Sequence, residues 1–324
     1  MIKQAIKSVL GEKNVTRIRR LKQSINAART TWRSTGETAQ NQPAQTEVWC
    51  LIQVHQLEKA MAVGKTSYVN SLKYSPVIAK LQGLIDGGMS PQSFTIRECA
   101  AVLSSALGQV SGHEEDKGEF SAFVKRNGIA LDLRGGVEVI PAREIFSHNT
   151  FDYHAFVSSR HSVRNFKDKI VSREVIYDIV RDALYCPSAC NRQPFKVYFS
   201  ENPGTVKRII KAGVEPFFAE KVHDALIVTC DRALLNPAER NDQEYINGGI
   251  FLMSLVLSIH AHGLGSCLFQ FLQANTRQAK IRKEFGISGS EVISAFVGIG
   301  EPEDEVVCAC AQRRPVESVA VYVE

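Results

Sequence analysis

The chain reads Arg160-His161-Ser162-Val163-Arg164-Asn165-Phe166 near its midpoint, and this stretch carries most of the information about its fold. It places two guanidinium groups four residues apart, with a serine hydroxyl between them. Arginine suits phosphate recognition because its planar fork of N–H groups matches a pair of phosphate oxygens. On its own, the composition of the stretch favours an exposed basic loop over a phosphate site.

A second informative stretch is Pro187-Ser188-Ala189-Cys190-Asn191-Arg192-Gln193-Pro194-Phe195. Proline, serine and asparagine are turn-forming residues, so we predict a compact loop here. Together the two stretches predict one loop that holds a phosphate and another that lies against a planar heterocycle. Cys186 and Cys190 flank the Pro-Ser turn and have two interpretations. They are either small packing residues, the commoner role of a free thiol, or redox-active groups.

Composition sets the limits of the interpretation. A length of 324 residues fits about two domains, and the hydrophobic fraction of 44% and charged fraction of 23% are ordinary for a globular protein. The net charge of +5 is mild. It fits an anionic small-molecule ligand, and we expect no nucleic-acid partner.

The cysteines and apolar segments predict a cytoplasmic protein. Several of the 8 cysteines lie in apolar runs, as Cys230 does, which indicates reduced, buried thiols. Their spacing lacks the paired Cys and His ligands of a zinc site, so we expect no metal. Met1–Leu10 lacks the apolar core of a secretory signal. Ile250–Ala261 is too short to span a membrane and predicts a core helix.

The first half of the chain, residues 1–145, is predicted to be a mostly helical extension. Met1–Gln40 is strongly basic and has three interpretations: a solvated helix, a docking segment for an anionic membrane surface or a partner complex, and an organelle-targeting segment. A polar linker follows at Ser34–Thr46. Periodicity then predicts helices at Glu47–Val63, Val77–Ile85, Phe94–Leu107 and Phe120–Val124, with a charged break at Gly112–Gly118 and a strand-like run within Leu131–Ile140.

The second half, residues 146–324, alternates between helical and strand patterns, which predicts an α/β or α+β sheet domain. Ser172 is a candidate cap for a helix that ends before Pro187, and Asn241–His262 predicts a long helix stopped by Gly263. Strands are predicted at Lys196–Ser200, Ala225–Cys230, Val292–Gly298 and Val316–Val323.

Four segments in order resemble the nitroreductase family. They are Arg160–Phe166, Pro187–Phe195, Ala261-His262-Gly263-Leu264-Gly265-Ser266, and the pair Gly298–Pro302 and Arg313-Arg314-Pro315. The resemblance covers about residues 151–324. It implies an α+β fold, in which helices flank a central, mostly antiparallel sheet, and a homodimer that holds FMN at the interface between exchanged segments.

The resemblance also implies a set of FMN contacts. Arg160, Ser162 and Arg313 would bind the phosphate, with Arg314 as second choice and His161 contributing through its backbone. Arg164 would approach the pyrimidine edge, where a cation stabilises the negative charge near N1 of reduced flavin. Further contacts would come from Pro187, Ser188 and Asn191 along the isoalloxazine and from Leu268, Phe269 and Gln270 on the N5 side. No acid–base dyad stands out, which is consistent with flavin chemistry, and the sequence assigns no catalytic side chain.

The implied activity is that of an FMN-dependent oxidoreductase. NAD(P)H would reduce the flavin at N5, and a nitroaromatic, a quinone or a specialised metabolite would accept the electrons in a ping-pong cycle. Two alternatives remain open at this point. One is a specialised flavin enzyme, such as a dehalogenase or an oxidase. The other is a flavin-fold binding or assembly protein without turnover, which docks through its basic N-terminus.

A weaker resemblance concerns Val54–Met61. Its His-x-x-Glu-Lys pattern, formed by His55, Glu58 and Lys59, is similar to a helix of extended nitroreductase-like proteins associated with polysaccharide biosynthesis. These side chains either line a substrate opening or form a surface ion pair, and the surface pair is the simpler interpretation.

Overall fold

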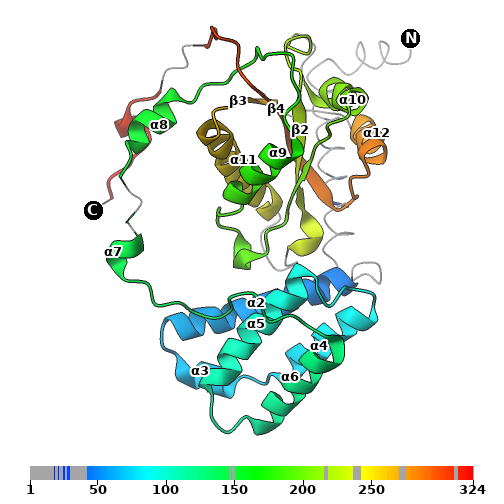
Figure 1. Ribbon diagram of the computed structural model, residues 1–324, viewed down its shortest axis with the longest axis vertical. Coiled ribbons are helices and arrows are strands. Elements are labelled where there is room, and N and C mark those ends of the chain that lie inside the picture. Colours follow the sequence, from blue (N-terminus) through cyan, green and yellow to red (C-terminus); the bar gives the residue numbers. More distant parts are fainter. Residues whose placement is uncertain are drawn as a thin grey trace.

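The computed structural model describes residues 42–145, 147, 150–214, 218–235, 242–269, 275–309 and 313–323, together with Ile18, Leu21, Ile25, Ala28 and Arg29. The predicted basic segment Met1–Gln40 therefore lies outside the described residues except at these five positions. Figure 1 shows two parts, which we call the helical bundle (residues 42–127) and the sheet unit (residues 160–308). They are joined by a chain that contains the short helices α7 (Ala142–Ile145) and α8 (Tyr153–Ser159).

The helical bundle contains α2 (Gln42–Ala62), α3 (Thr66–Ser71), α4 (Ser75–Asp86), α5 (Phe94–Gln109) and α6 (Glu114–Asn127). Its core is built from side chains at helical spacing, among them Leu57, Leu81, Leu103 and Phe123, all 0% exposed. The four predicted helices are confirmed. The charged break predicted at Gly112–Gly118 is wrong, because α6 begins at Glu114. Its acidic first turn suits the positive end of the helix dipole.

The sheet unit is built on four strands, β1 (Phe195–Tyr198), β2 (Ala225–Asp231), β3 (Gly265–Phe269) and β4 (Glu291–Gly300). Their order is β1-β2-β4-β3, and every neighbouring pair is antiparallel. The predicted α+β fold with an antiparallel sheet is confirmed. The two central strands, β2 and β4, are buried along almost their whole length, which explains why both read as continuous apolar runs.

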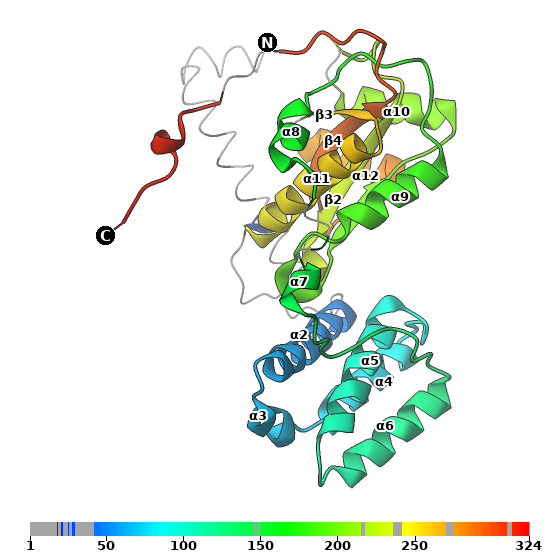
Figure 2. The same cartoon turned by 60° about the vertical axis from the view of Figure 1, so that its left-hand side comes forward.

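Helices cover both faces of this sheet (Figures 1 and 2). Helices α9 (Arg173–Ala183) and α11 (Gln243–Ala261) pack on one face around Leu226, Val228 and Val297. Helices α10 (Pro203–Gly213) and α12 (Asn275–Phe285) lie on the other face, where Ile227 and Phe296 point. Within the described part of the chain, α11 alone has the length and apolar composition to cross a membrane, and 44% of it is buried in the protein. It packs as the predicted core helix.

Two predicted strands are wrong. The run within Leu131–Ile140 has no strand conformation, and Gly135 in this run packs on the backbone of α5 at Ala101 and Val102. The segment Val316–Val323 begins with a single helical turn, η3 (Val316–Ser318), and continues as exposed chain. Alternating side chains predict a strand only where a partner edge is available, and the described residues offer neither segment such an edge.

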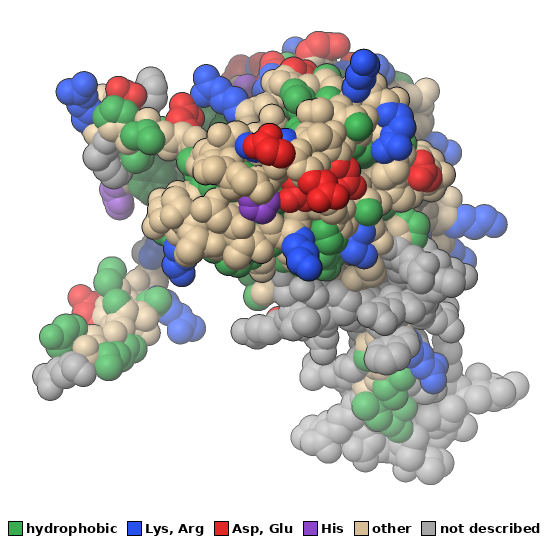
Figure 3. All heavy atoms as spheres, turned by 90° about the horizontal axis from the view of Figure 1, so that it is seen from below, with side chains coloured by type: hydrophobic (Ala, Val, Ile, Leu, Met, Phe, Trp, Pro, Cys, Tyr) green, Lys and Arg blue, Asp and Glu red, His purple; other side chains and the backbone are tan. Residues whose placement is uncertain are grey.

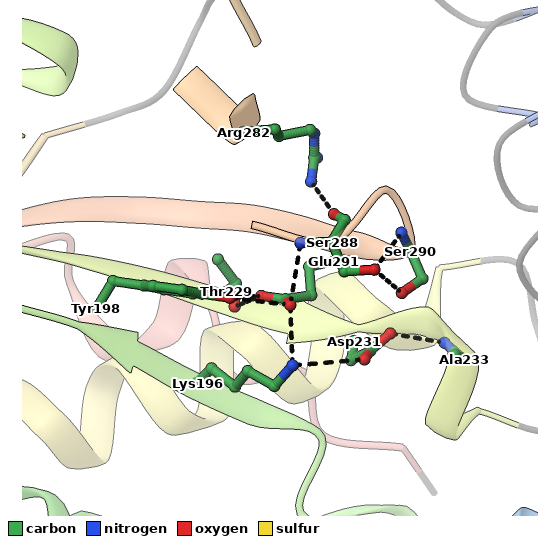
Figure 4. Close-up of polar contacts among 9 residues, drawn as sticks. All are labelled: Lys196, Tyr198, Thr229, Asp231, Ala233, Arg282, Ser288, Ser290 and Glu291. Atoms are coloured by element: carbon green, nitrogen blue, oxygen red, sulfur yellow. Dashed lines mark hydrogen bonds and ion pairs between the residues drawn. The ribbon is translucent and has the colours of Figure 1, made fainter. Parts of the chain in front are cut away.

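A buried carboxylate locks one end of the sheet (Figure 4). Glu291 on β4 is 1% exposed and accepts hydrogen bonds from Thr229 Oγ1 at 2.6 Å, Tyr198 Oη at 2.8 Å and Lys196 Nζ at 2.9 Å. Burial alone would raise the pKa of Glu291, but these three donors outweigh it and the pKa is lowered. The ionised side chain therefore ties β1, β2 and β4 together.

Candidate functional site

The stretch Arg160–Phe166 lies beside the first residues of β3. The backbone N–H of Val163 donates to the carbonyl of Ser266 at 3.0 Å, and Ser162 forms a parallel bridge with Ser266. A side chain at Gly265 would meet Val163 at 2.9 Å, so the glycine permits this close approach. The first and third of the predicted segments therefore lie side by side.

Phe166 anchors the end of this stretch. Its ring is 1% exposed and packs against Gly300, where an added Cβ would lie 3.2 Å from the ring. The backbone of Phe166 also bridges to Pro302 in antiparallel fashion. The segment Gly298–Pro302 thus joins the same neighbourhood, and Arg160–Phe166 is fixed at both ends.

A cavity of about 500 Å³ opens where α8, α11 and β3 meet. Arg160, His161 and His260 line it together with Ser159, Gly263, Leu264, Gly265, Ser266, Pro302, Val306 and Cys308. The hydroxyl of Ser159 lies 2.9 Å from Nε2 of His260. A guanidinium, two imidazoles and two hydroxyls around one cavity form a donor set suited to an anion.

Arg164 is half-buried and does not line this cavity. Its guanidinium lies 5.3 Å from the ring centroid of Phe218, and Nη1 is 3.4 Å from the carbonyl of Ser162. The aromatic face holds the cation in place. The ring of Phe218 is in turn 6.0 Å from that of Phe269 on β3, so Arg164 is linked to this strand through aromatic contacts.

The remaining predicted contacts on β3 and at the C-terminus are spread out. Leu268 is 45% exposed on β3, whereas the side chain of Phe269 is buried in the core, and Gln270 lies outside the described residues. Arg313 and Arg314 are exposed, as is the whole segment 313–323. Figure 3 shows this segment standing apart from the body at the lower left. The structure does not bring these two arginines to the cavity of Arg160.

The loop Pro187–Pro194 has an unusual backbone. It contains the single turn η1 (Ala189–Asn191), and three of its non-glycine residues have positive φ: Cys190 at 49°, Asn191 at 50° and Gln193 at 47°. Asparagine tolerates this region, but cysteine and glutamine adopt it at a cost of about 1–3 kcal/mol each. The hydroxyl of Ser188 accepts the N–H of Gln193 at 3.1 Å and closes the loop. Such strain is typical of a functional site.

This loop lies at the far end of α11 from the Arg160 cavity. The N–H of Ala189 donates to the side chain of Asn247 at 3.0 Å, whereas His260 at the other end of the helix lines the cavity. Asn247 and His260 are thirteen residues apart on α11, which is about 20 Å at ~1.5 Å per residue. A single chain therefore holds the two predicted halves of the site well apart.

The helical bundle touches the loop as well. Helix α2 contacts η1 and η2 (Arg232–Leu234) of the sheet unit. Farther along α2, Nδ1 of His55 lies 3.2 Å from Glu58, and both side chains are about a quarter exposed. Burial, together with the charge of Glu58, raises the pKa of the neighbouring Glu98. His55 and Glu58 thus contact each other, as the pair interpretation predicts, although both side chains are half-buried.

Comparison with known proteins identifies the sheet unit. Residues 157–237 and 226–301 match the model of the nitroreductase family. Residues 157–301 belong to the nitroreductase family. A protein of Archaeoglobus fulgidus, provisionally named NADH dehydrogenase/NAD(P)H nitroreductase, is 25% identical over 150 residues, which are 46% of this chain and 84% of that protein.

Solved structures are similar to the same nitroreductase domain. A provisionally named nitroreductase of Desulfovibrio desulfuricans, solved in complex with FMN, is 19% identical and matches 54% of this chain and 99% of that one, with a TM-score of 0.45. An FMN-dependent nitroreductase of Clostridium difficile is 22% identical and matches 48% and 90% of the two chains, with a TM-score of 0.41.

Three contacts of the site escaped the sequence interpretation. The sequence gives no sign that His260 lines the cavity, and its neighbour His262 pairs with Asp182 on α9 instead. Asn247 carried one available signal, a polar residue inside an apolar helix. The contact of α2 with the Pro187–Pro194 loop had no local signal, since it joins segments more than a hundred residues apart.

Proposed function

We propose that the nitroreductase domain is an FMN-dependent oxidoreductase that takes electrons from NAD(P)H and passes them to a small-molecule acceptor. The observation that carries this proposal is the docking of Arg160–Phe166 on Ser266 at the mouth of the anion-suited cavity. The family match over residues 157–301 supports the same conclusion. FMN would supply the hydride chemistry, and the acceptor would be a nitroaromatic, a quinone or a specialised metabolite.

The residues present fit this cofactor. Arg160 and the backbone of His161 would hold the phosphate in a cavity that already gathers donors. Ser162, which bridges to Ser266 in the lining of this cavity, would add its hydroxyl. The guanidinium of Arg164, fixed over Phe218, would place a positive charge beside the pyrimidine edge. Pro187, Ser188 and Asn191 would support the isoalloxazine, and the exposed edge of β3 at Leu268 would face its N5 side.

We further propose that the domain acts as a homodimer, because one chain keeps the two halves of the site about 20 Å apart. Helix α11 presents an apolar stripe suited to a second copy: Ile246, Ile250 and Met253 are 41%, 38% and 50% exposed. The C-terminal segment adds Val321 and Tyr322, both more than 80% exposed.

We also propose that residues 1–145 and 146–324 form separate domains and that the protein acts in the cytoplasm.

The visible spectrum tests the enzymatic proposal. We expect the full chain, purified with FMN present and then desalted, to keep a flavin absorption band that NADH or NADPH bleaches under anaerobic conditions. A chain that retains no FMN would refute the flavoenzyme. A bound flavin that neither nucleotide bleaches would instead support the alternative of a binding or assembly protein without turnover.

Mixing two defective chains tests the shared site. Arg160→Ala removes the phosphate contact, and Asn191→Val removes the loop amide and places a β-branched residue at a φ of 50°. Each variant alone should bind little FMN. A mixed dimer, isolated through two different affinity tags, should regain one intact site per dimer and bind about half of the wild-type amount. Mixed dimers as poor as the two parents would show that both loops serve a site within one chain.

A further inference from the structure

Asn247 connects helix α11 to the Pro187–Pro194 loop. It is 2% exposed, and its Oδ1 accepts the N–H of Ala189 at 3.0 Å. Its Nδ2 donates to the carbonyl of Gln243 at 2.8 Å and lies 3.1 Å from Oε1 of the same residue. The donor side of the carboxamide is therefore satisfied within the helix. This arrangement fixes the oxygen toward the loop, because the flipped amide would face two donors toward each other.

The position of Asn247 depends on close packing of its helix. Gly248 follows it, and an added Cβ there would lie 2.6 Å from Ser294 Oγ on β4. The glycine thus lets α11 lie against the sheet near Asn247. The loop is held from its other end as well, where the carbonyl of Pro194 accepts the N–H of Asp231 at 2.7 Å.

The loop itself needs external support. Cys190, Asn191 and Gln193 all have left-handed backbones, which persist only where the surroundings impose them. Among the contacts of the described residues, the bond from Ala189 to Asn247 pins the start of this left-handed run, just after Ser188.

We propose that Asn247 is a positioning residue of the flavin site, holding the turn Ala189–Gln193 in the shape that presents Ser188 and Asn191 to the isoalloxazine. This inference rests on the proposed function for its ligand. It gives the side-chain amide of Asn247, buried on a core helix, an indirect role in FMN binding. The amide supports the loop and does not contact the flavin itself.

Three variants of the full chain test the proposal by FMN titration, followed by flavin fluorescence. Asn247→Leu removes the acceptor, and we expect it to weaken FMN binding at least tenfold. Asn247→Asp keeps an oxygen for Ala189 but turns its second oxygen toward the acceptors of Gln243, so it should bind FMN more tightly than Asn247→Leu and more weakly than wild type. Ser258→Ala is the matched control, since it removes another buried hydrogen bond of α11, to Ile179 at 2.9 Å, far from the loop. It should leave FMN affinity unchanged within twofold while lowering the melting temperature.

A readout without FMN separates this proposal from the proposed function. Cys190 lies in the loop and is half-buried, whereas Cys230 is 0% exposed in the core. In Asn247→Leu we expect Cys190 to be alkylated at least threefold faster, measured by peptide mass spectrometry, with no change at Cys230. Equal acceleration at both thiols would mean general loosening and would overturn the proposal, as would wild-type FMN affinity in Asn247→Leu. If wild-type protein binds no FMN, the proposed function fails, while the alkylation rates still decide whether Asn247 holds the loop.

Discussion

Replacing Arg160 by alanine is expected to weaken FMN binding by roughly 10- to 100-fold. Hydrogen bonds to charged groups contribute about 1.5–3 kcal/mol, and each ~1.4 kcal/mol corresponds to a factor of ten in affinity. Arg160 is half-buried at the cavity, between the C-terminus of α8 and the bridge to Ser266, so nearby side chains cannot easily replace its guanidinium. The measurement is the dissociation constant for FMN, from titration of protein stripped of cofactor.

Arg181→Ala is the matched control for this substitution. It removes an arginine of the same domain that is exposed on α9 and pairs with Asp178. FMN affinity should remain at the wild-type value, because a surface ion pair contributes little and lies away from the cavity. If the wild-type protein binds FMN and Arg160→Ala binds it as tightly as Arg181→Ala does, the phosphate assignment is wrong.

Gly213→Ala is expected to destabilise the sheet unit by about 3 kcal/mol, at the upper end of the range for overpacked cores. Gly213 is the last residue of α10, and an added Cβ would overlap the ring of Phe296, which is 0% exposed at the centre of β4. The ring cannot move aside easily, because interiors are close-packed. Urea unfolding, followed by a spectroscopic signal that reports on the sheet unit, gives the change in the free energy of unfolding.

The control for Gly213 is Gly118→Ala. Gly118 lies within α6, where an added Cβ would meet nothing within 4 Å. Alanine should stabilise this helix by roughly 0.5–1 kcal/mol, because glycine loses more backbone entropy on folding. Opposite signs for the two substitutions would confirm that contact with Phe296, rather than loss of a glycine as such, governs stability. A neutral Gly213→Ala would mean that α10 can shift on the sheet.

The sequence predicted the neighbours of Arg160 better than it predicted the distance to Pro187. The contacts of Arg160–Phe166 follow from short apolar anchors such as Val163 and Phe166, whose chemistry is visible locally. The separation of the two loops follows from helix α9, whose 11 residues carry the chain about 16 Å before Pro187. The apolar periodicity after Ser172 predicts this helix, but a local pattern does not reveal which chain supplies each loop to a shared site.

The wrong strand prediction at the C-terminus concerns pairing between segments far apart in the sequence. Val316–Val323 alternates like a strand, but no local pattern reveals whether a partner edge exists.

Helix α10 is absent from the sequence prediction, although the sequence contains the signals of its start. Asn202 caps the helix by accepting the N–H of Thr205 at 3.0 Å, and Pro203 follows in the first turn. For Ser172, the predicted position of the cap is correct, but its hydroxyl forms no capping hydrogen bond.

The distance between the Arg160 cavity and the Asn191 loop has a thermodynamic consequence. If each flavin lies between two chains, cofactor binding and association are linked by mass action. Dilution then releases FMN even when the free cofactor concentration stays constant, and added FMN drives monomers together. The apparent affinity measured at low protein concentration would understate the affinity of the assembled site. The yellow colour of a preparation would thus report how much of the protein is paired.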